Sequence, residues 1–221
     1  MVQPGTEPRR SHRRLPRDRS RRHAGRSLAV AVVALLIATL SAVPQNVTTV
    51  ERSLFYAVNG LSDVIEWPLW VVMQLGAALV IPVMALVAFL GWRRLRPAAD
   101  VLAAGTLAWL SARVMKDALE RGRPPSFFED VKLRGSLGAG GDEGLGFPSG
   151  HATVAFALAI VVFPYIPLPW RVVTVVLATI VAFSRLYFGA HFPLDVLGGA
   201  ALGIAIAASV HLALDLVTHR H

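Results

Sequence analysis

Six long apolar stretches, almost free of charged side chains, restrict this sequence to the folds of membrane proteins. They cover residues 27–43, 68–90, 98–115, 152–163, 172–183 and 196–217. A helix that crosses a bilayer needs about 20 apolar residues, and the second, third and sixth stretches have that length. The first is short, and the fourth and fifth reach it only with polar flanks. Charged residues make up 16% of the chain, against about 25% in soluble domains. The sequence therefore predicts an all-α bundle of six transmembrane helices.

Much of the positive charge precedes the first apolar stretch. The formal net charge is +8, and residues 1–26 contain Arg9, Arg10, Arg13, Arg14, Arg17, Arg19, Arg21, Arg22 and Arg26. This segment has no apolar periodicity, so we predict a disordered basic cytoplasmic tail, followed by one membrane domain over 27–221. A nucleic-acid-binding arm is the alternative. We favour a topology signal because the tail directly precedes an apolar stretch, and we predict no nucleic-acid partner.

The first apolar stretch, residues 27–43, has the basic start and apolar core of a signal peptide. We favour an uncleaved anchor, because the body of a membrane protein follows it. Either interpretation places the next segment, residues 45–67, outside the cell. The topology predicted for the rest of the chain is therefore the same in both cases.

Positive charge also sets the predicted orientation. With the basic tail inside, the second stretch returns to the cytoplasm at residues 92–96, WRRLR, which are again basic, as the positive-inside rule requires. Counting onward places residues 117–147 outside and both termini in the cytoplasm. We therefore expect a multi-pass protein of the cell membrane. Polar residues from three distant segments meet at its extracytoplasmic face, and such convergence marks a functional site.

The first of these polar segments is KDALERGRP, residues 116–124. Lys116 ends an apolar stretch, and Arg123 is held in extended backbone by the proline that follows it. Ammonium and guanidinium groups both bind phosphate, so this pair could grip a dianion from two sides. The alternative is a pair of cations that snorkel to the lipid headgroups.

The second segment, Pro148-Ser149-Gly150-His151, immediately precedes an apolar stretch. Ser149 occupies the position of a helix N-cap. Gly150 allows an anion to approach the free N–H groups of the first helical turn. Taken alone, the segment favours an ordinary helix start, with Ser149 as the N-cap and His151 as a first-turn residue without a catalytic role.

The third segment is SRLYFGAHFPLD, residues 184–195. Pro193 suits the first turn of a helix, so Asp195 lies four residues after His191 and can reach back to it. A carboxylate on one imidazole nitrogen fixes the tautomer and leaves the other nitrogen free as a nucleophile. The alternative makes Asp195 a charge that matches the helix dipole, which leaves Arg185 and His191 unexplained.

Taken together, the three segments resemble the type 2 phosphatidic acid phosphatase superfamily. Its motifs are Lys-x6-Arg-Pro, Pro-Ser-Gly-His and Ser-Arg-x5-His-x3-Asp, and this chain matches every position in order and spacing. Three spaced motifs are far more specific than any one of them. The resemblance implies a six-helix membrane enzyme that hydrolyses a lipid phosphate or diphosphate.

The resemblance also implies roles for individual residues. His191 would attack phosphorus and form a phosphohistidine, Asp195 would orient it, and His151 would protonate the leaving oxygen and then activate water. The residues expected to hold the phosphoryl oxygens are Lys116, Arg123, Arg185, Ser149 and Gly150. The motifs contain no carboxylate cluster for a metal ion, the chain has no cysteine, and the family needs no cofactor.

Two other functions stay open at this point. Vanadium-dependent haloperoxidases belong to the same superfamily, but they are mostly soluble, and the membrane plan argues against that activity. A catalytically silent lipid-phosphate-binding protein would not need both histidines and Asp195. The family handles phosphatidic acid, phosphatidylglycerol phosphate and polyprenyl diphosphates, and an outward-facing site favours the last. The expected partners are this lipid substrate and the membrane lipids, while the oligomeric state is not defined by the sequence.

Outside the motifs, three residues are candidate substrate contacts. Arg113 lies three residues before Lys116 and shares its helix face, where it either snorkels to headgroups or extends the cationic wall. Phe127 and Phe128 are expected to enter the interface and to anchor an outer loop beside the lipid entrance. The glycine-rich segment 135–146 follows them and is predicted to be mobile.

Overall fold

The computed structural model describes residues 17–135 and 144–217, and its regular structure is helical, which confirms the all-α prediction. An isolated β-bridge joins Gly122 and Leu145. The longer helices are α1 (Arg17–Ala42), α2 (Thr49–Asn59), α3 (Glu66–Met73), α4 (Val80–Trp92), α5 (Leu95–Leu119), α6 (Gly150–Val161), α7 (Leu168–Tyr187) and α8 (Pro193–Val217).

Four helices, α1, α5, α7 and α8, are long and apolar enough to cross a membrane. The second predicted stretch is not one straight helix, because α3 and α4 flank the 3-10 turn Gln74–Gly76 and the two halves meet at 74°. Counted as one broken span, this pair is a fifth crossing. The fourth predicted stretch forms α6, a helix of only 12 residues. Six full-length crossings are therefore not confirmed within the described part of the chain.

The first helix begins earlier than its apolar stretch predicts. α1 starts at Arg17, so residues 17–26 of the predicted disordered tail are helical. Arginine is a good helix former, and a search for apolar residues alone misses such a polar extension. The rest of the predicted tail, residues 1–16, and the last four residues, 218–221, lie outside the described part.

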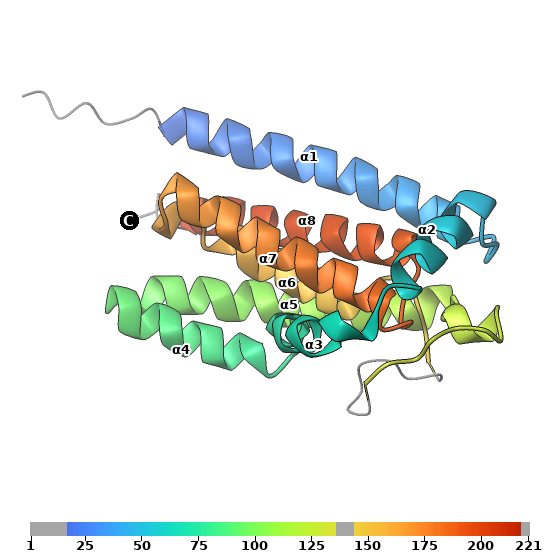
Figure 1. Ribbon diagram of the computed structural model, residues 1–221. Helices are drawn as coiled ribbons and strands as arrows, with labels where there is room; N and C mark the ends of the chain where they lie inside the picture. Colours follow the sequence, from blue (N-terminus) through green and yellow to red (C-terminus); the bar gives the residue numbers. More distant parts are fainter. Residues whose placement is uncertain (1–16, 136–143, 218–221) are drawn as a thin grey trace, which may run out of the picture.

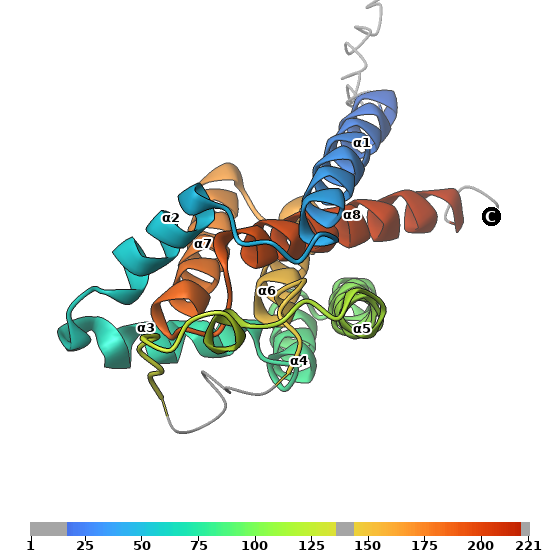
Figure 2. The same cartoon turned by 90° about the vertical axis from the view of Figure 1, so that its right-hand side faces the viewer.

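Helix α8 lies between α1 and α6, which is clearest along the bundle axis in Figure 2. Its close packing on α6 depends on two glycines. A Cβ atom on Gly203 would lie 2.3 Å from the carbonyl oxygen of Thr153, and one on Gly199 would lie 2.6 Å from that of Ser149. Small residues four apart allow membrane helices to approach this closely. The contact joins the start of α6 to the helix that carries Asp195.

The two ends of the bundle carry different parts of the chain. The start of α1 and the end of α8 lie at one end, whereas the connections that follow α1, α5 and α7 gather at the other (Figure 1). The three motif segments belong to this second end. The motif residues and the two ends of the described chain are therefore separated by the length of the bundle.

Candidate active site

Residues of all three motifs meet at one end of the bundle. Lys116 lies in the last turn of α5, Arg185 in the last turn of α7, and Asp195 in the first turn of α8. The second motif starts α6 at Gly150. His191 is surrounded by charge, because it interacts electrostatically with Lys116, Arg123, Arg185 and His151.

His191 and Asp195 are both buried, and they face each other. The Nδ1 atom of His191 lies 3.5 Å from Oδ2 of Asp195, and this oxygen also accepts a hydrogen bond of 2.8 Å from the backbone N–H of Phe192. The histidine contact is longer than an ordinary hydrogen bond. Catalytic hydrogen bonds are often long before a substrate is bound. The two side chains therefore face each other as predicted, but the distance between Nδ1 and Oδ2 is longer than that of a hydrogen bond.

The surroundings of His191 keep its imidazole neutral. Burial lowers the pKa of His191 well below its usual value, and the positive charges of Lys116, Arg185 and Arg123 lower it further. A neutral imidazole has a free lone pair, which a nucleophile requires. If Asp195 accepts the proton on Nδ1, the free nitrogen is Nε2.

This charge pattern predicts a shift in the pH profile. A lowered pKa keeps His191 neutral to lower pH, so activity should persist on the acidic side. In Arg123→Gln one nearby positive charge is lost, the pKa of His191 rises, and the acidic limb of kcat/KM moves to higher pH. The ratio of variant to wild-type kcat/KM on nitrophenyl phosphate measures this shift, because ionisation of the ester cancels. Lys132→Gln, which changes an exposed cation, is the control, and an identical profile in both variants would contradict the prediction.

Three cations form the expected phosphate grip, and backbone or sulfur acceptors engage them. Lys116 donates to the carbonyl oxygens of Leu145 and Gly146, the second at 3.3 Å. Arg123 Nε lies 3.5 Å from the same Leu145 oxygen. Arg185 is buried, donates from Nη1 to the sulfur of Met73 at 2.9 Å, and has an Nε without a hydrogen-bond partner in the described chain. Lys116 and Arg185 therefore face backbone and sulfur acceptors that a phosphate could replace.

The start of α6 presents an open helix end to the same place. Ser149 is the N-cap residue, yet its side chain makes no capping bond, and its buried Oγ has no partner among the described residues. A Cβ atom on Gly150 would have no neighbour within 4 Å, so space is open beside the first N–H groups. A Cβ atom on Gly76 would lie 2.5 Å from the carbonyl oxygen of His151. The break between α3 and α4 thus supports the backbone that carries His151.

The three candidate substrate contacts have other neighbours. The Arg113 guanidinium lies 5.6 Å from the centre of the Trp109 ring on the exposed side of α5. Phe127 and Phe128 pack against Phe192, at 5.7 and 6.0 Å between ring centres. Both rings therefore hold the outer loop against the residue next to His191. Most of the glycine-rich segment, residues 136–143, lies outside the described residues.

Two residues of the site were missed by sequence reasoning. Arg121 is fully buried and forms ion pairs with Asp195 and with Glu51. Arg121 lies inside the first motif segment, two residues before Arg123. In the sequence, this position was the only signal that Arg121 belongs to the site. Glu51 lies on α2, and nothing in its local sequence connects it to the motifs.

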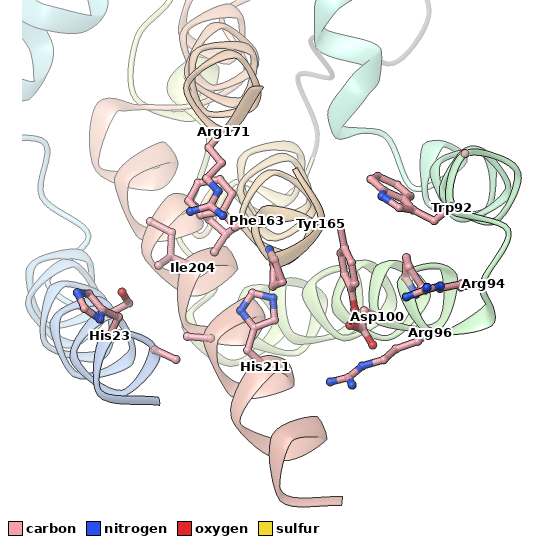
Figure 3. Close-up of a pocket in the computed structure, with 17 residues that line it drawn as sticks. His23, Trp92, Arg94, Arg96, Asp100, Phe163, Tyr165, Arg171, Ile204 and His211 are labelled. Atoms are coloured by element: carbon pink, nitrogen blue, oxygen red, sulfur yellow. Dashed lines mark hydrogen bonds between the residues drawn. The ribbon is translucent and has the colours of Figure 1, made fainter. Parts of the chain in front are cut away.

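A cavity of about 880 Å³ lies at the opposite end of the bundle (Figure 3). It is lined by basic residues from several elements, including Arg94, Arg171 and His211, and by the hydrogen-bonded pair of Tyr165 and Asp100. Basic residues at this end fit the predicted cytoplasmic side. None of the motif residues lines this cavity, so its large volume does not mark it as the active site. Over residues 17–135 and 144–217, no three His, Asp or Glu side chains are arranged to hold a metal ion.

Comparison with known proteins agrees with this geometry. The sequence profile of the PAP2 superfamily matches residues 97–218, more than half of the chain. The chain belongs to the PAP2 superfamily. The match confirms the resemblance to type 2 phosphatidic acid phosphatases that the three motifs indicated, and it includes all three.

Several PAP2 relatives are lipid phosphatases. Lipid A 1-phosphatase of Rhizobium johnstonii is 33% identical over 97 residues, 42% of this chain, and the chain spans 38% of that protein. Decaprenylphosphoryl-5-phosphoribose phosphatase of Mycobacterium tuberculosis is 31% identical over 185 residues, which cover 80% of this chain and 88% of the relative. The crystal structure of Aquifex aeolicus LpxE superposes with a TM-score of 0.67 at 25% identity, over 74% of this chain and 96% of that one.

Proposed function

We propose that this protein is an integral membrane phosphatase that hydrolyses a lipid phosphate or diphosphate through a phosphohistidine intermediate. The main support is the buried, neutral His191 beside Asp195, surrounded by the cations Lys116, Arg123 and Arg185. Histidine supplies the nucleophile, and the cations stabilise the charge on the phosphoryl oxygens. Membership of the PAP2 superfamily and the names of the relatives support hydrolysis of a lipid phosphate.

The proposed reaction has two steps. In the first, Nε2 of His191 attacks the terminal phosphorus, and the bond to the leaving oxygen breaks; this is the lipid oxygen of a monophosphate or the bridging oxygen of a diphosphate. Protonated His151 gives its proton to that oxygen. The negative charge of the bound substrate offsets the cations near His151 and favours its protonated form. In the second step, His151 takes a proton from water as the water attacks phosphorus, the bond to His191 breaks, and inorganic phosphate leaves.

We propose a polyprenyl-linked phosphate or diphosphate as the substrate class. The mycobacterial relative, named for a decaprenyl-linked substrate, matches along most of both chains. The lipid A phosphatase relative matches over a shorter region and makes lipid A the second candidate. The apolar helices on either side of the site would hold a long lipid chain within the bilayer.

Phosphate release from purified protein tests the proposal. The panel comprises a polyprenyl diphosphate, the monophosphate, phosphatidic acid, phosphatidylglycerol phosphate and lipid A. Release is measured with a metal chelator and with added vanadate. We expect the highest kcat/KM on a polyprenyl substrate, full activity with the chelator, and inhibition by vanadate. Bromide oxidation by vanadate-loaded protein with peroxide would instead support a haloperoxidase, and binding without turnover would support a silent protein.

We also propose that the site faces the extracytoplasmic side and that both termini are cytoplasmic. The chain has no cysteine, so a single introduced one reports on its own position. In intact cells, Glu129→Cys in the loop beside the site should react with an impermeant maleimide, whereas Pro167→Cys at the other end should react only after lysis. The reverse pattern would overturn the orientation and move the proposed substrate to the inner leaflet.

Arg113 is proposed as a contact for the second phosphate or the headgroup of the lipid. Its place on the exposed side of α5, against Trp109, supports a role outside the motif residues. Arg113→Ala should lower kcat/KM for a polyprenyl diphosphate and leave nitrophenyl phosphate hydrolysis unchanged, because remote contacts act only on a substrate that reaches them. Arg93→Ala, at the other end of the bundle, is the control. Equal loss on both substrates, or no loss on either, would refute this role.

A further inference from the structure

A buried arginine at one of the unspecified positions of the first motif joins two carboxylates beside the site. Arg121 lies in the loop after α5, and its side chain is 0% exposed. Its Nη1 lies 2.7 Å from Oδ1 of Asp195, and its Nη2 lies 2.9 Å from Oε2 of Glu51. A buried charge is costly unless it is paired and hydrogen-bonded. Among the described residues, Asp195 and Glu51 are the hydrogen-bond partners of the Arg121 side chain, so the positions of these two carboxylates depend on it.

The contact with Arg121 determines how Asp195 points. One carboxylate oxygen, Oδ1, is held by the guanidinium, while the other, Oδ2, accepts from the Phe192 N–H and faces His191. Rotation of the carboxylate would break both hydrogen bonds. Because the histidine contact itself is 3.5 Å long, it is too weak to set this orientation. Arg121 is therefore the stronger constraint on the group that orients His191.

Arg121 is itself fixed from several sides. Glu51 accepts from Arg121 with one oxygen and from the N–H of Leu194 with the other, at 3.2 Å. The carbonyl oxygen of Arg121 accepts from the N–H of Gly146 at 2.5 Å. The ring of Phe192 lies 5.4 Å from the guanidinium. The network thus connects α2, the loop after α5 and the first turn of α8.

We propose that Arg121 is a positioning residue for catalysis, which holds the Asp195 carboxylate so that Oδ2 faces His191, and that Glu51 holds Arg121 in place. Arg121 acts through Asp195 and does not touch the phosphate. The proposal deepens the phosphatase function proposed above and rests on it.

A double-mutant cycle tests whether Arg121 acts through Asp195. The four proteins are the wild type, Arg121→Met, Asp195→Asn and the double variant, assayed on nitrophenyl phosphate. We expect Arg121→Met to lower kcat by about 10- to 100-fold, the size of the loss when a residue that orients a metal-binding histidine is removed in metalloenzymes, with KM nearly unchanged. In the Asp195→Asn background the same change should cost nothing further, because the effects of coupled residues are not additive. Losses that multiply, or wild-type kcat in Arg121→Met, would overturn the proposal.

Two further variants separate positioning from folding. Arg121→Met leaves two buried carboxylates without their partner, so Glu51→Gln/Arg121→Met, which removes one of them, is the variant to use if the first is unstable. Arg121→Lys keeps the charge but lacks the planar fork, and should restore part of kcat. The matched control is Arg134→Met. Arg134 is also buried at this end, where it bonds to Asp63 and to backbone carbonyls, and its loss should multiply with Asp195→Asn.

A spectroscopic readout keeps the positioning role testable without turnover. Nitrogen NMR of the histidines should show His191 protonated at Nδ1 in the wild type and a mixture of tautomers in Arg121→Met. A wild type that is inactive on every substrate would refute the phosphatase proposal alone, and the tautomer signal would still decide the role of Arg121. An unchanged His191 signal in Arg121→Met would refute that role.

Discussion

His191→Ala is expected to abolish turnover, with kcat lower by about 10⁶-fold, on the order of the loss when the nucleophile of a serine protease is removed. The physical reason is that alanine offers no lone pair to phosphorus, while the cations that bind phosphate remain in place. Substrate should therefore still bind, and no phosphoenzyme should form. Rapid acid quench with radiolabelled substrate measures the phosphoenzyme directly.

The matched control for this prediction is His211→Ala. His211 lies at the opposite end of the bundle, where its Nε2 is 2.9 Å from the carbonyl oxygen of Val161. This variant should form phosphoenzyme at the wild-type rate. Normal turnover in His191→Ala would show that another group attacks phosphorus and would refute the assigned nucleophile.

His151→Ala should have the second largest effect, and its size should depend on the leaving group. The alkoxide that leaves from a lipid monophosphate needs a proton as it departs, and loss of a general acid costs about 10²- to 10⁴-fold. Nitrophenolate leaves without a proton, so the first step should stay fast on nitrophenyl phosphate. The second step still lacks its base, so phosphoenzyme should accumulate. A burst of nitrophenolate would report its formation.

The measurement compares the burst with the steady-state rate for the two kinds of ester. Gly76→Ala is a useful companion variant, because its Cβ would press on the backbone of His151 without removing the imidazole. It should slow both esters together. An equal loss on lipid and nitrophenyl esters in His151→Ala would contradict the role of general acid and base.

The sequence was sufficient for the parts of the site that depend on local patterns. The spacing of His191 and Asp195, and the glycine that opens the start of α6, are visible in short segments, and the structure places them together. The pairing of Glu51 with Arg121 spans 70 residues and leaves no periodic signal. The sequence also predicted that Asp195 reaches back to His191, but its shorter contact is with Arg121.

The helix boundaries show a similar division. Long apolar runs located α5 and α8 well, because length and hydropathy are local properties. The break between α3 and α4 was missed because the need for Gly76 arises only when the backbone of His151 lies against it. The early start of α1 was missed because helical backbone does not require apolar side chains.

The carbonyl oxygen of Leu145 has the place among the cations that a phosphoryl oxygen would take in the proposed mechanism. It accepts from Lys116 and from Arg123, so an arriving phosphate must displace it. The displaced carbonyl would remain next to the site, because the chain holds it there, and would compete for the same donors. In the proposed reaction, this carbonyl oxygen would therefore compete with inorganic phosphate, the last product, for Lys116 and Arg123. Such competition would weaken the binding of the product and would restore the starting arrangement of the site after each turnover.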